Sequence, residues 1–225
     1  MGKKILVTKS SLPTFEEYTE KIKGIWETSW MTNCGPLYQE LESDLKEYLK
    51  CKNLELYVNG HMALDIAIKA LHLKGEVITT PFSFVSTTHA LTLNGLTPVF
   101  CDIKKDGYTI DEDQVERLIT DKTSAILAVH VYGIPCNLKQ LAKIAERHKL
   151  KLIYDAAHAF GVEINGQSIA MYGDISMFSL HATKVFNTIE GGALTFKDNS
   201  LTRHLKNLRN FGIEGPESIT EIGLN

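Results

Sequence analysis

Polar residues that could bind a ligand or react with one follow directly after two apolar, strand-like runs. Asp155 closes the run Lys-Leu-Ile-Tyr, and Ser179 closes the run Ile-Ser-Met-Phe, with Lys184 five residues further on. A lysine that is partly removed from water loses its proton more easily, and the neutral amine can form a Schiff base with an aldehyde. A carboxylate at such a depth needs a cation or several donors. Taken singly, Lys184 also fits an exposed loop lysine, and Asp155 a capped turn.

The segment Asn59-Gly60-His61-Met62 joins another apolar run to a helix-like segment. Glycine lets the backbone come close to a ligand, and the free amides at a helix start bind phosphate well. Strand-to-helix turns of this kind are common, so the segment alone is weak evidence. Beside a lysine and a carboxylate at strand ends, it indicates a ligand that carries a phosphate and an aldehyde, as pyridoxal phosphate does.

Three further side chains suit the same ligand. Phe84 could stack on a flat ring, Ser179 could add a hydroxyl to the phosphate, and His158 could reach a phenolic oxygen. Asp155 would pair with the protonated ring nitrogen, which keeps the ring an electron sink. A core aromatic residue, a serine that bonds to nearby backbone and a packed histidine are the plainer alternatives. The eight histidines show no metal-ligand spacing.

Strand-like and helical patterns alternate along the chain. Short strands separated by helical segments of about ten residues imply right-handed crossovers and a mainly parallel sheet. The last two predicted strands have no helix between them, which predicts a local antiparallel pair. The predicted strands are 54–58, 76–80, 98–103, 125–131, 152–157, 175–180 and 193–196, and the predicted helices are 14–26, 36–49, 63–71, 83–93, 111–119, 137–148 and 200–211. The fold class is α/β.

Composition narrows the function further. The 225 residues include 24 Lys plus Arg against 27 Asp plus Glu, a net charge of −3. The chain therefore lacks the excess of basic residues that is typical of nucleic-acid-binding proteins. Four cysteines without CxxC spacing indicate reduced thiols rather than a metal site or disulfides. No apolar run approaches membrane-spanning length. We therefore expect a cytoplasmic protein that binds neither nucleic acid nor membranes.

Several motifs together resemble one enzyme family over almost the whole chain. They are Trp30-Met-Thr-Asn-Cys-Gly-Pro, Thr79-Thr-Pro-Phe-Ser-Phe-Val-Ser-Thr, Asp155-Ala-Ala-His-Ala and Ser179-Leu-His-Ala-Thr-Lys184, followed by Glu190-Gly-Gly. The sequence resembles the DegT/DnrJ/EryC1/StrS sugar aminotransferases, which are fold-type I pyridoxal-phosphate enzymes acting on nucleotide-linked keto-sugars. The resemblance implies a three-layer α/β/α large domain.

The resemblance also implies a role for each candidate residue. Lys184 would hold the cofactor aldehyde and shuttle the proton, Asp155 would pair with the ring nitrogen, and Phe84 would cover one ring face. His158 stands where the family often has glutamine near the phenolic oxygen. The residues implied at the phosphate are Gly60, His61, Met62 and Ser179, with Asn225 offered to the phosphate of the partner subunit.

At the level of the whole protein, the resemblance implies transfer of an amino group from an amino acid, expected to be glutamate, to a nucleotide-linked 4-keto-6-deoxy sugar. The N-terminal pattern looks most like enzymes that form 4-amino-4,6-dideoxy sugars on dTDP, in amino-sugar and O-antigen or polysaccharide biosynthesis. A homodimer with shared active sites is expected. The expected domains are an N-terminal helical arm over residues 1–30 and a pyridoxal-phosphate-binding large domain over 31–225, truncated before the small C-terminal domain of the family.

One departure and three alternatives accompany this interpretation. Asn59-Gly60-His61 replaces the usual Ser-Gly-Thr, so the threonine hydroxyl is missing and His61 would contribute backbone or imidazole. A 3-amino product fits these residues too. A nucleotide-cofactor oxidoreductase would need a GxGxxG motif after an early strand, and Gly60-His-Met-Ala-Leu-Asp lacks it. An aminotransferase-like domain that binds cofactor or a partner chain without turnover stays open.

Overall fold

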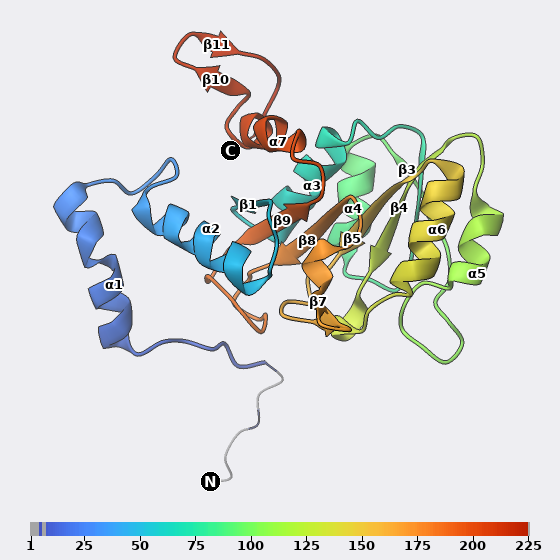
Figure 1. Cartoon of the computed structure of the whole chain (residues 1–225), viewed down its shortest axis with the longest axis horizontal. Helices are drawn as coiled ribbons and strands as arrows, with labels where there is room; N and C mark the ends of the chain where they lie inside the picture. The colour runs from blue at the N-terminus through green and yellow to red at the C-terminus, as the bar shows by residue number, and fades with distance from the viewer. Residues whose placement is uncertain (1–4, 6–7, 225) are drawn as a thin grey trace.

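The computed structural model describes residue 5 and residues 8–224, and its centre is a seven-stranded sheet (Figure 1). The strand order is β1-β9-β8-β5-β4-β2-β3. The strands are β1 Leu54–Tyr57, β2 Glu76–Thr79, β3 Thr97–Phe100, β4 Thr123–Val129, β5 Lys151–Asp155, β8 Ile175–Ser179 and β9 Gly192–Phe196. Pairs among β3, β2, β4, β5 and β8 are parallel, whereas β9 runs antiparallel to both β8 and β1. The predicted α/β class and the antiparallel pair are confirmed.

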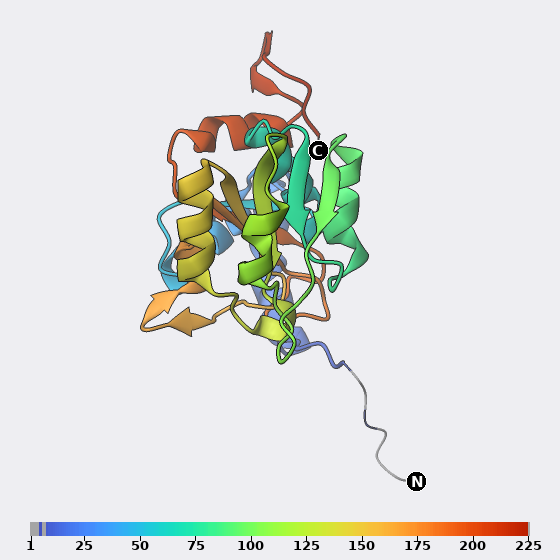
Figure 2. The same cartoon turned by 90° about the vertical axis from the view of Figure 1, so that its right-hand side faces the viewer.

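Helices cover both faces of the sheet, as Figure 2 shows from the side. Side chains alternate along the buried strands, so Ile126 and Ala128 face one apolar core while Ala125 and Leu127 face the other. The helices of the first core are α2 Pro36–Tyr48, α5 Glu112–Val115 and α6 Leu138–His148, and those of the second are α3 Gly60–Ala70, α4 Val85–Leu93 and α7 Leu201–Arg209. The predicted three-layer architecture is therefore confirmed.

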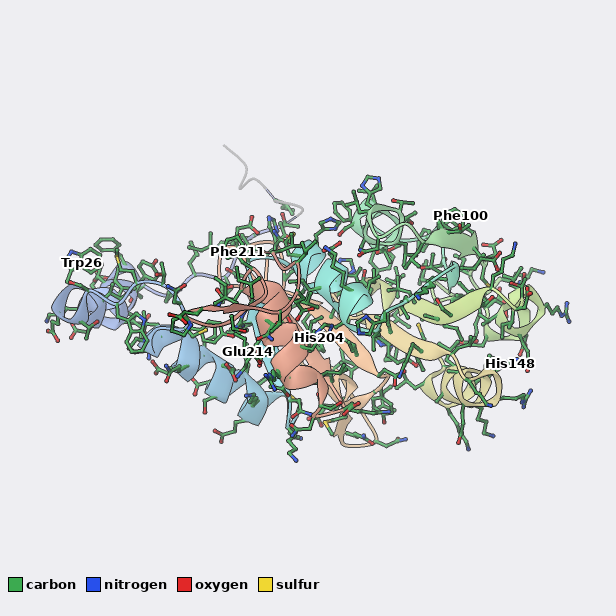
Figure 3. The ribbon with its side chains drawn as sticks, turned by 90° about the horizontal axis from the view of Figure 1, so that it is seen from above. Trp26, Phe100, His148, His204, Phe211 and Glu214 are labelled. Carbon is green, nitrogen blue, oxygen red and sulfur yellow. The ribbon has the colours of Figure 1, made fainter. Side chains whose placement is uncertain are left out.

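The helix α1, Phe15–Thr28, stands away from the sheet (Figure 1). It begins with a capping box, in which the Thr14 hydroxyl accepts from the Glu17 amide and the Glu17 carboxylate accepts from the Thr14 amide. None of its residues is buried, and Trp26 lies at the opposite end of the molecule from Phe100 (Figure 3). The prediction of an amphipathic helix here is confirmed; Phe15, Tyr18 and Trp26 are exposed, whereas Ile22 and Ile25 are half-buried.

The structure differs from the sequence prediction at several short elements. The expected helix over 111–119 is only α5, followed by a 3-10 turn over Glu116–Leu118. Four short strands were not predicted: β6 Glu163–Ile164 pairs with β7 Gln167–Ser168, and β10 Ile213–Gly215 pairs with β11 Ser218–Ile219. Further 3-10 turns span Val131–Gly133 and Ile169–Met171. Across residue 5 and residues 8–224, no helix has the length and apolar character needed to cross a membrane.

Buried His130, directly after β4, makes folding stability sensitive to pH. Its ring is fully buried and stacks on Tyr154 with centroids 4.6 Å apart, and its Nδ1 accepts from the Cys136 amide at 3.2 Å. Burial lowers the pKa of His130 from 6.5 to about 3. The folded protein therefore holds this imidazole neutral between those two values, while the unfolded chain protonates it.

We expect the free energy of unfolding to fall as the pH drops below about 6.5, by up to about 1.4 kcal/mol per pH unit from this residue. The loss continues until the pH reaches the folded-state pKa of about 3. Urea unfolding at a series of pH values gives the free energy of unfolding at each pH. We expect this free energy to depend less steeply on pH in His130→Phe than in wild type. His89→Phe, at an exposed position, is the control and should keep the pH dependence of wild type. The same pH dependence in His130→Phe as in wild type would contradict the role given to His130.

Candidate active site

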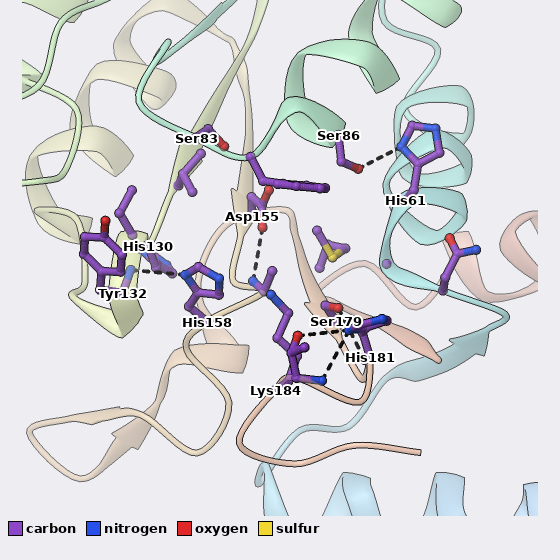
Figure 4. Close-up of a pocket in the computed structure, with 18 of the residues that line it drawn as sticks. His61, Ser83, Ser86, His130, Tyr132, Asp155, His158, Ser179, His181 and Lys184 are labelled. Atoms are coloured by element: carbon purple, nitrogen blue, oxygen red, sulfur yellow. Dashed lines mark hydrogen bonds between the residues drawn. The ribbon is translucent and has the colours of Figure 1, made fainter. Parts of the chain in front are cut away.

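A cavity of about 850 Å³ opens where the carboxyl ends of β4, β5 and β8 meet the first turns of α3 and α4. This is the edge at which open α/β sheets bind ligands. Figure 4 shows polar side chains from these separate elements converging on it. The predicted site residues that line the cavity are Gly60, His61, Phe84, Asp155, His158, Ser179 and Lys184.

Two predicted residues are not among them. Met62 is not part of the cavity wall, and its amide donates to Asn59 Oδ1 at 2.8 Å, so this amide is occupied by the helix cap. That Met62 belongs to the turn that holds a phosphate stays a prediction, with its amide engaged in the helix cap. Asn225 lies outside the described residues.

Asp155 ends β5 with only 5% of its surface exposed. Its Oδ2 accepts from the Thr87 hydroxyl at 2.7 Å, and its Oδ1 accepts from the Ala157 amide at 3.1 Å. Burial raises the pKa of Asp155, and these two bonds together with the charges of His158 and Lys184 act in the opposite direction. Both groups that donate directly to this carboxylate are neutral, so they leave its negative charge unbalanced. A cation placed against it would therefore be strongly held.

Lys184 lies in the turn between β8 and β9, where its amide donates to the His181 carbonyl at 2.8 Å. Figure 4 shows its side chain extending into the cavity beside Asp155. Partial burial lowers the pKa of Lys184, and the carboxylate of Asp155 raises it in part. The amine is thus closer to losing its proton than an ordinary surface lysine, as nucleophilic attack on a carbonyl requires.

His158 is held as a neutral donor by the turn after β4. The Tyr132 amide donates to His158 Nδ1 at 3.3 Å, and the two rings lie stacked with centroids 6.3 Å apart. Burial and the charge of Lys184 lower the pKa of His158, with Asp155 opposing them. Because Nδ1 accepts, the hydrogen of the neutral ring lies on Nε2, where it can donate to a ligand oxygen.

The turn that supplies this amide is built from left-handed backbone. Tyr132 has a φ of 56° and Gly133 a φ of 79°. A Cβ on Gly133 would lie 2.8 Å from the His158 carbonyl oxygen, so this position needs glycine for both its conformation and its space.

The start of α3 forms the other end of the cavity. The amides of Gly60 and His61 belong to its first turn, which has no intrahelical acceptors, and the helix dipole adds partial positive charge there. A Cβ on Gly60 would lie 3.1 Å from Met177 Sδ and 3.2 Å from Ser179 Cβ. The imidazole of His61 bonds through Nδ1 to Ser86 Oγ at 2.8 Å. This end suits an anionic group such as a phosphate.

Sequence reasoning missed four residues of this site: Ser83, Ser86, Thr87 and Tyr132. Ser83 and Thr87 are four residues apart around the start of α4, a spacing at which side chains can meet, but a sequence does not show which partner a hydroxyl will find. No group of three His, Cys, Asp or Glu side chains within residue 5 and residues 8–224 could hold a metal ion.

Comparisons with known proteins show the family of the chain. The model of the DegT/DnrJ/EryC1/StrS aminotransferase family matches residues 14–224. The chain is 47% identical over 225 residues to a dTDP-4-amino-4,6-dideoxy-D-glucose transaminase from Shigella dysenteriae, covering 100% of this chain and 61% of that protein. A transaminase of the same name from Escherichia coli is 46% identical over 99% of this chain and 60% of its own length. The chain thus spans about three fifths of these relatives.

Solved structures give the same result. The structure of DesI with its TDP-sugar product superposes with a TM-score of 0.94 at 36% identity, covering 100% of this chain and 57% of DesI. The family model matches nearly the whole described chain, and relatives above 30% identity support the same family. The chain belongs to the DegT/DnrJ/EryC1/StrS aminotransferase family.

Proposed function

We propose that this chain forms the cofactor site of a pyridoxal-phosphate-dependent aminotransferase that acts on a nucleotide-linked keto-sugar. The observation that carries the proposal is the placement of Lys184, a partly buried amine, in one cavity with the buried carboxylate of Asp155 and the open first turn of α3. These three groups match the aldehyde, the ring nitrogen and the phosphate of one small molecule.

The residues present fit pyridoxal phosphate, and family membership supports it as the cofactor. Gly60 and His61 amides with Ser179 would hold the phosphate, Asp155 the ring nitrogen, His158 Nε2 the phenolic oxygen, and Lys184 the aldehyde. When bound, the cofactor supplies an aldehyde and an electron-withdrawing ring. Lys184 would hold and return the proton that moves during amino transfer. Phe84, which lines the cavity and is 77% exposed, would cover a ring face.

The substrate class follows from the relatives. The Shigella dysenteriae relative is a dTDP-4-amino-4,6-dideoxy-D-glucose transaminase, and DesI was solved with a TDP-sugar product. We therefore propose a dTDP-linked 4-keto-6-deoxy sugar as acceptor and an amino acid, with glutamate as first choice, as donor.

The direct test is to incubate the protein with pyridoxal phosphate, L-glutamate and dTDP-4-keto-6-deoxy-glucose, and to separate the products by mass spectrometry. We expect a dTDP-amino-sugar and 2-oxoglutarate in equal amounts. Cofactor binding without either product would favour the alternative, an aminotransferase-like domain that binds but does not turn over. Absence of cofactor binding, measured by absorbance titration beside NAD⁺ as the competing candidate, would reject the proposal.

We also propose that two copies associate so that each covers the other's cavity. Phe84, which lines the cavity, is 77% exposed, and two more exposed apolar residues, Val185 at 83% and Ile189 at 59%, are next in sequence to the lining residues Lys184 and Glu190. The helix α1 carries further exposed ones, such as Phe15 and Trp26 at 75% each. Clusters of this kind mark protein interfaces. Sedimentation equilibrium at micromolar concentration would show twice the monomer mass, and a monomer at all concentrations would reject this part.

A further inference from the structure

A chain of two hydroxyl groups leads from the cavity wall to Asp155. Ser83 Oγ lies 2.7 Å from Thr87 Oγ1, and Thr87 Oγ1 lies 2.7 Å from Asp155 Oδ2. Thr87 is fully buried, whereas Ser83 lines the cavity. We call these residues the hydroxyl relay. None of the roles assigned above to the cofactor-binding residues uses it.

The chemistry of the groups fixes the direction of the relay. A hydroxyl has a single hydrogen, and an ionised carboxylate only accepts. The hydrogen of Thr87 therefore goes to Asp155, and Ser83 must donate to Thr87. If Asp155 were protonated, the carboxyl group could itself donate to Thr87, and the direction of the two hydrogen bonds would no longer be fixed. Hydrogen bonds to the charged form favour that form, so the relay selects the ionised carboxylate.

The position of Thr87 within α4 also favours the ionised form of Asp155. Thr87 is the third residue of the helix, so Asp155 lies against the positive end of its dipole. The Ala157 amide supplies the second donor to the carboxylate, and the titratable groups that face it are His158 and Lys184. Burial alone would drive Asp155 toward its neutral form, and a neutral carboxyl group could not balance a protonated ring nitrogen.

We propose that Ser83 and Thr87 are positioning residues that hold the Asp155 carboxylate ionised and oriented toward the ring nitrogen of the cofactor. This inference rests on the proposed function for the identity of the ligand. The relay itself is present in the protein without cofactor, so its effect on Asp155 can be measured separately from cofactor binding.

The test follows the protonation of Asp155 in the cofactor-free protein by infrared spectroscopy of the carboxyl band, assigned by its loss in Asp155→Asn. Thr87→Val keeps the shape of the side chain and removes the hydroxyl. We expect its Asp155 pKa to rise by about one unit or more, the size expected for a lost hydrogen bond to a charged group. Ser83→Ala should give a smaller rise, because Thr87 still donates. Thr87→Ser should restore the wild-type value.

The matched control is Thr92→Val on the same helix, where the exposed hydroxyl bonds only to carbonyls of its own helix, those of Thr88 and His89. It should leave the Asp155 titration unchanged. The same pKa in wild type, Thr87→Val and Ser83→Ala would overturn the relay, even if all three bind cofactor. If Thr87→Val does not fold, the comparison of Ser83→Ala with wild type decides alone.

A parallel titration with pyridoxal phosphate separates the two proposals. Weaker binding in Thr87→Val than in wild type, in step with the rise in the Asp155 pKa, would support the relay in its proposed role. Wild-type protein that shows the expected carboxyl titration but binds no pyridoxal phosphate would reject the proposed function, and with it the assigned ligand, while leaving the hydroxyl relay as a measured property of Asp155.

Discussion

Lys184→Ala is expected to abolish amino transfer, with a loss of at least about 10⁴-fold, the upper end of what one positioned proton-transfer group contributes. The reason is that Lys184 is the amine that the structure brings into the cavity beside Asp155, where burial lowers its pKa. A second measurement tests the role of Lys184 without turnover. Borohydride reduction of wild type with bound pyridoxal phosphate should leave a pyridoxyl adduct on Lys184, located by peptide mass spectrometry.

The control for this experiment is Lys197→Ala, which removes an exposed lysine outside the cavity. It should keep both the adduct and the activity. Lys184→Arg retains a positive charge but offers no amine that condenses with an aldehyde, so it should behave like Lys184→Ala. An adduct found on any other lysine, or undiminished in Lys184→Ala, would contradict the assignment.

Asp155→Ala is expected to weaken cofactor binding by about 2–5 kcal/mol, the usual loss when one partner of a buried charge pair is removed. This corresponds to a dissociation constant raised roughly 30-fold to several-thousand-fold. The carboxylate is nearly inaccessible and held by the Thr87 hydroxyl and the Ala157 amide, so no solvent cation can easily replace a protonated ring nitrogen there. Absorbance titration with pyridoxal phosphate gives the constant directly.

Unfolding of the cofactor-free protein separates this effect from a general loss of structure. Asp155→Asn keeps the shape of the side chain without its charge, and we expect it to bind almost as poorly as Asp155→Ala. The exposed Asp106→Ala serves as the control and should bind as wild type does. Equal affinity in Asp155→Asn and wild type would mean that the carboxylate does not pair with the cofactor.

The sequence predicted most of the architecture because its signals are local. Asp155 and Ser179 end buried strands, and parallel pairing brings such ends to one edge of the sheet, so their meeting followed from the predicted topology. The sequence did not show that the Met62 amide donates to Asn59, because a sequence does not reveal which acceptor an amide at a helix start will find. The β6–β7 hairpin carried a readable signal, since Asn165-Gly166 adopts positive φ at both turn positions.

Other parts of the site lie beyond what a sequence pattern can show. The hydrogen on His158 Nε2 depends on the Tyr132 amide, and that amide points at the ring only because Tyr132 takes a left-handed conformation. Nothing in the residue type predicts this, since tyrosine is rarely found there. The partner of Thr87 likewise depends on how α4 is rotated against β5, which is decided by packing in the core that α4 shares with that face of the sheet.

The position of β1 at the edge of the sheet has a consequence for how the protein is made. Its only strand neighbour among the described residues is β9, and Tyr57 pairs with Gly192. At about 5–20 residues per second of synthesis, the ribosome delivers β9 roughly 7–27 s after β1. During that interval the nascent chain carries an unpaired apolar strand, which is the kind of segment that chaperones shield. We therefore expect the sheet to close late, as the last step of folding rather than the first.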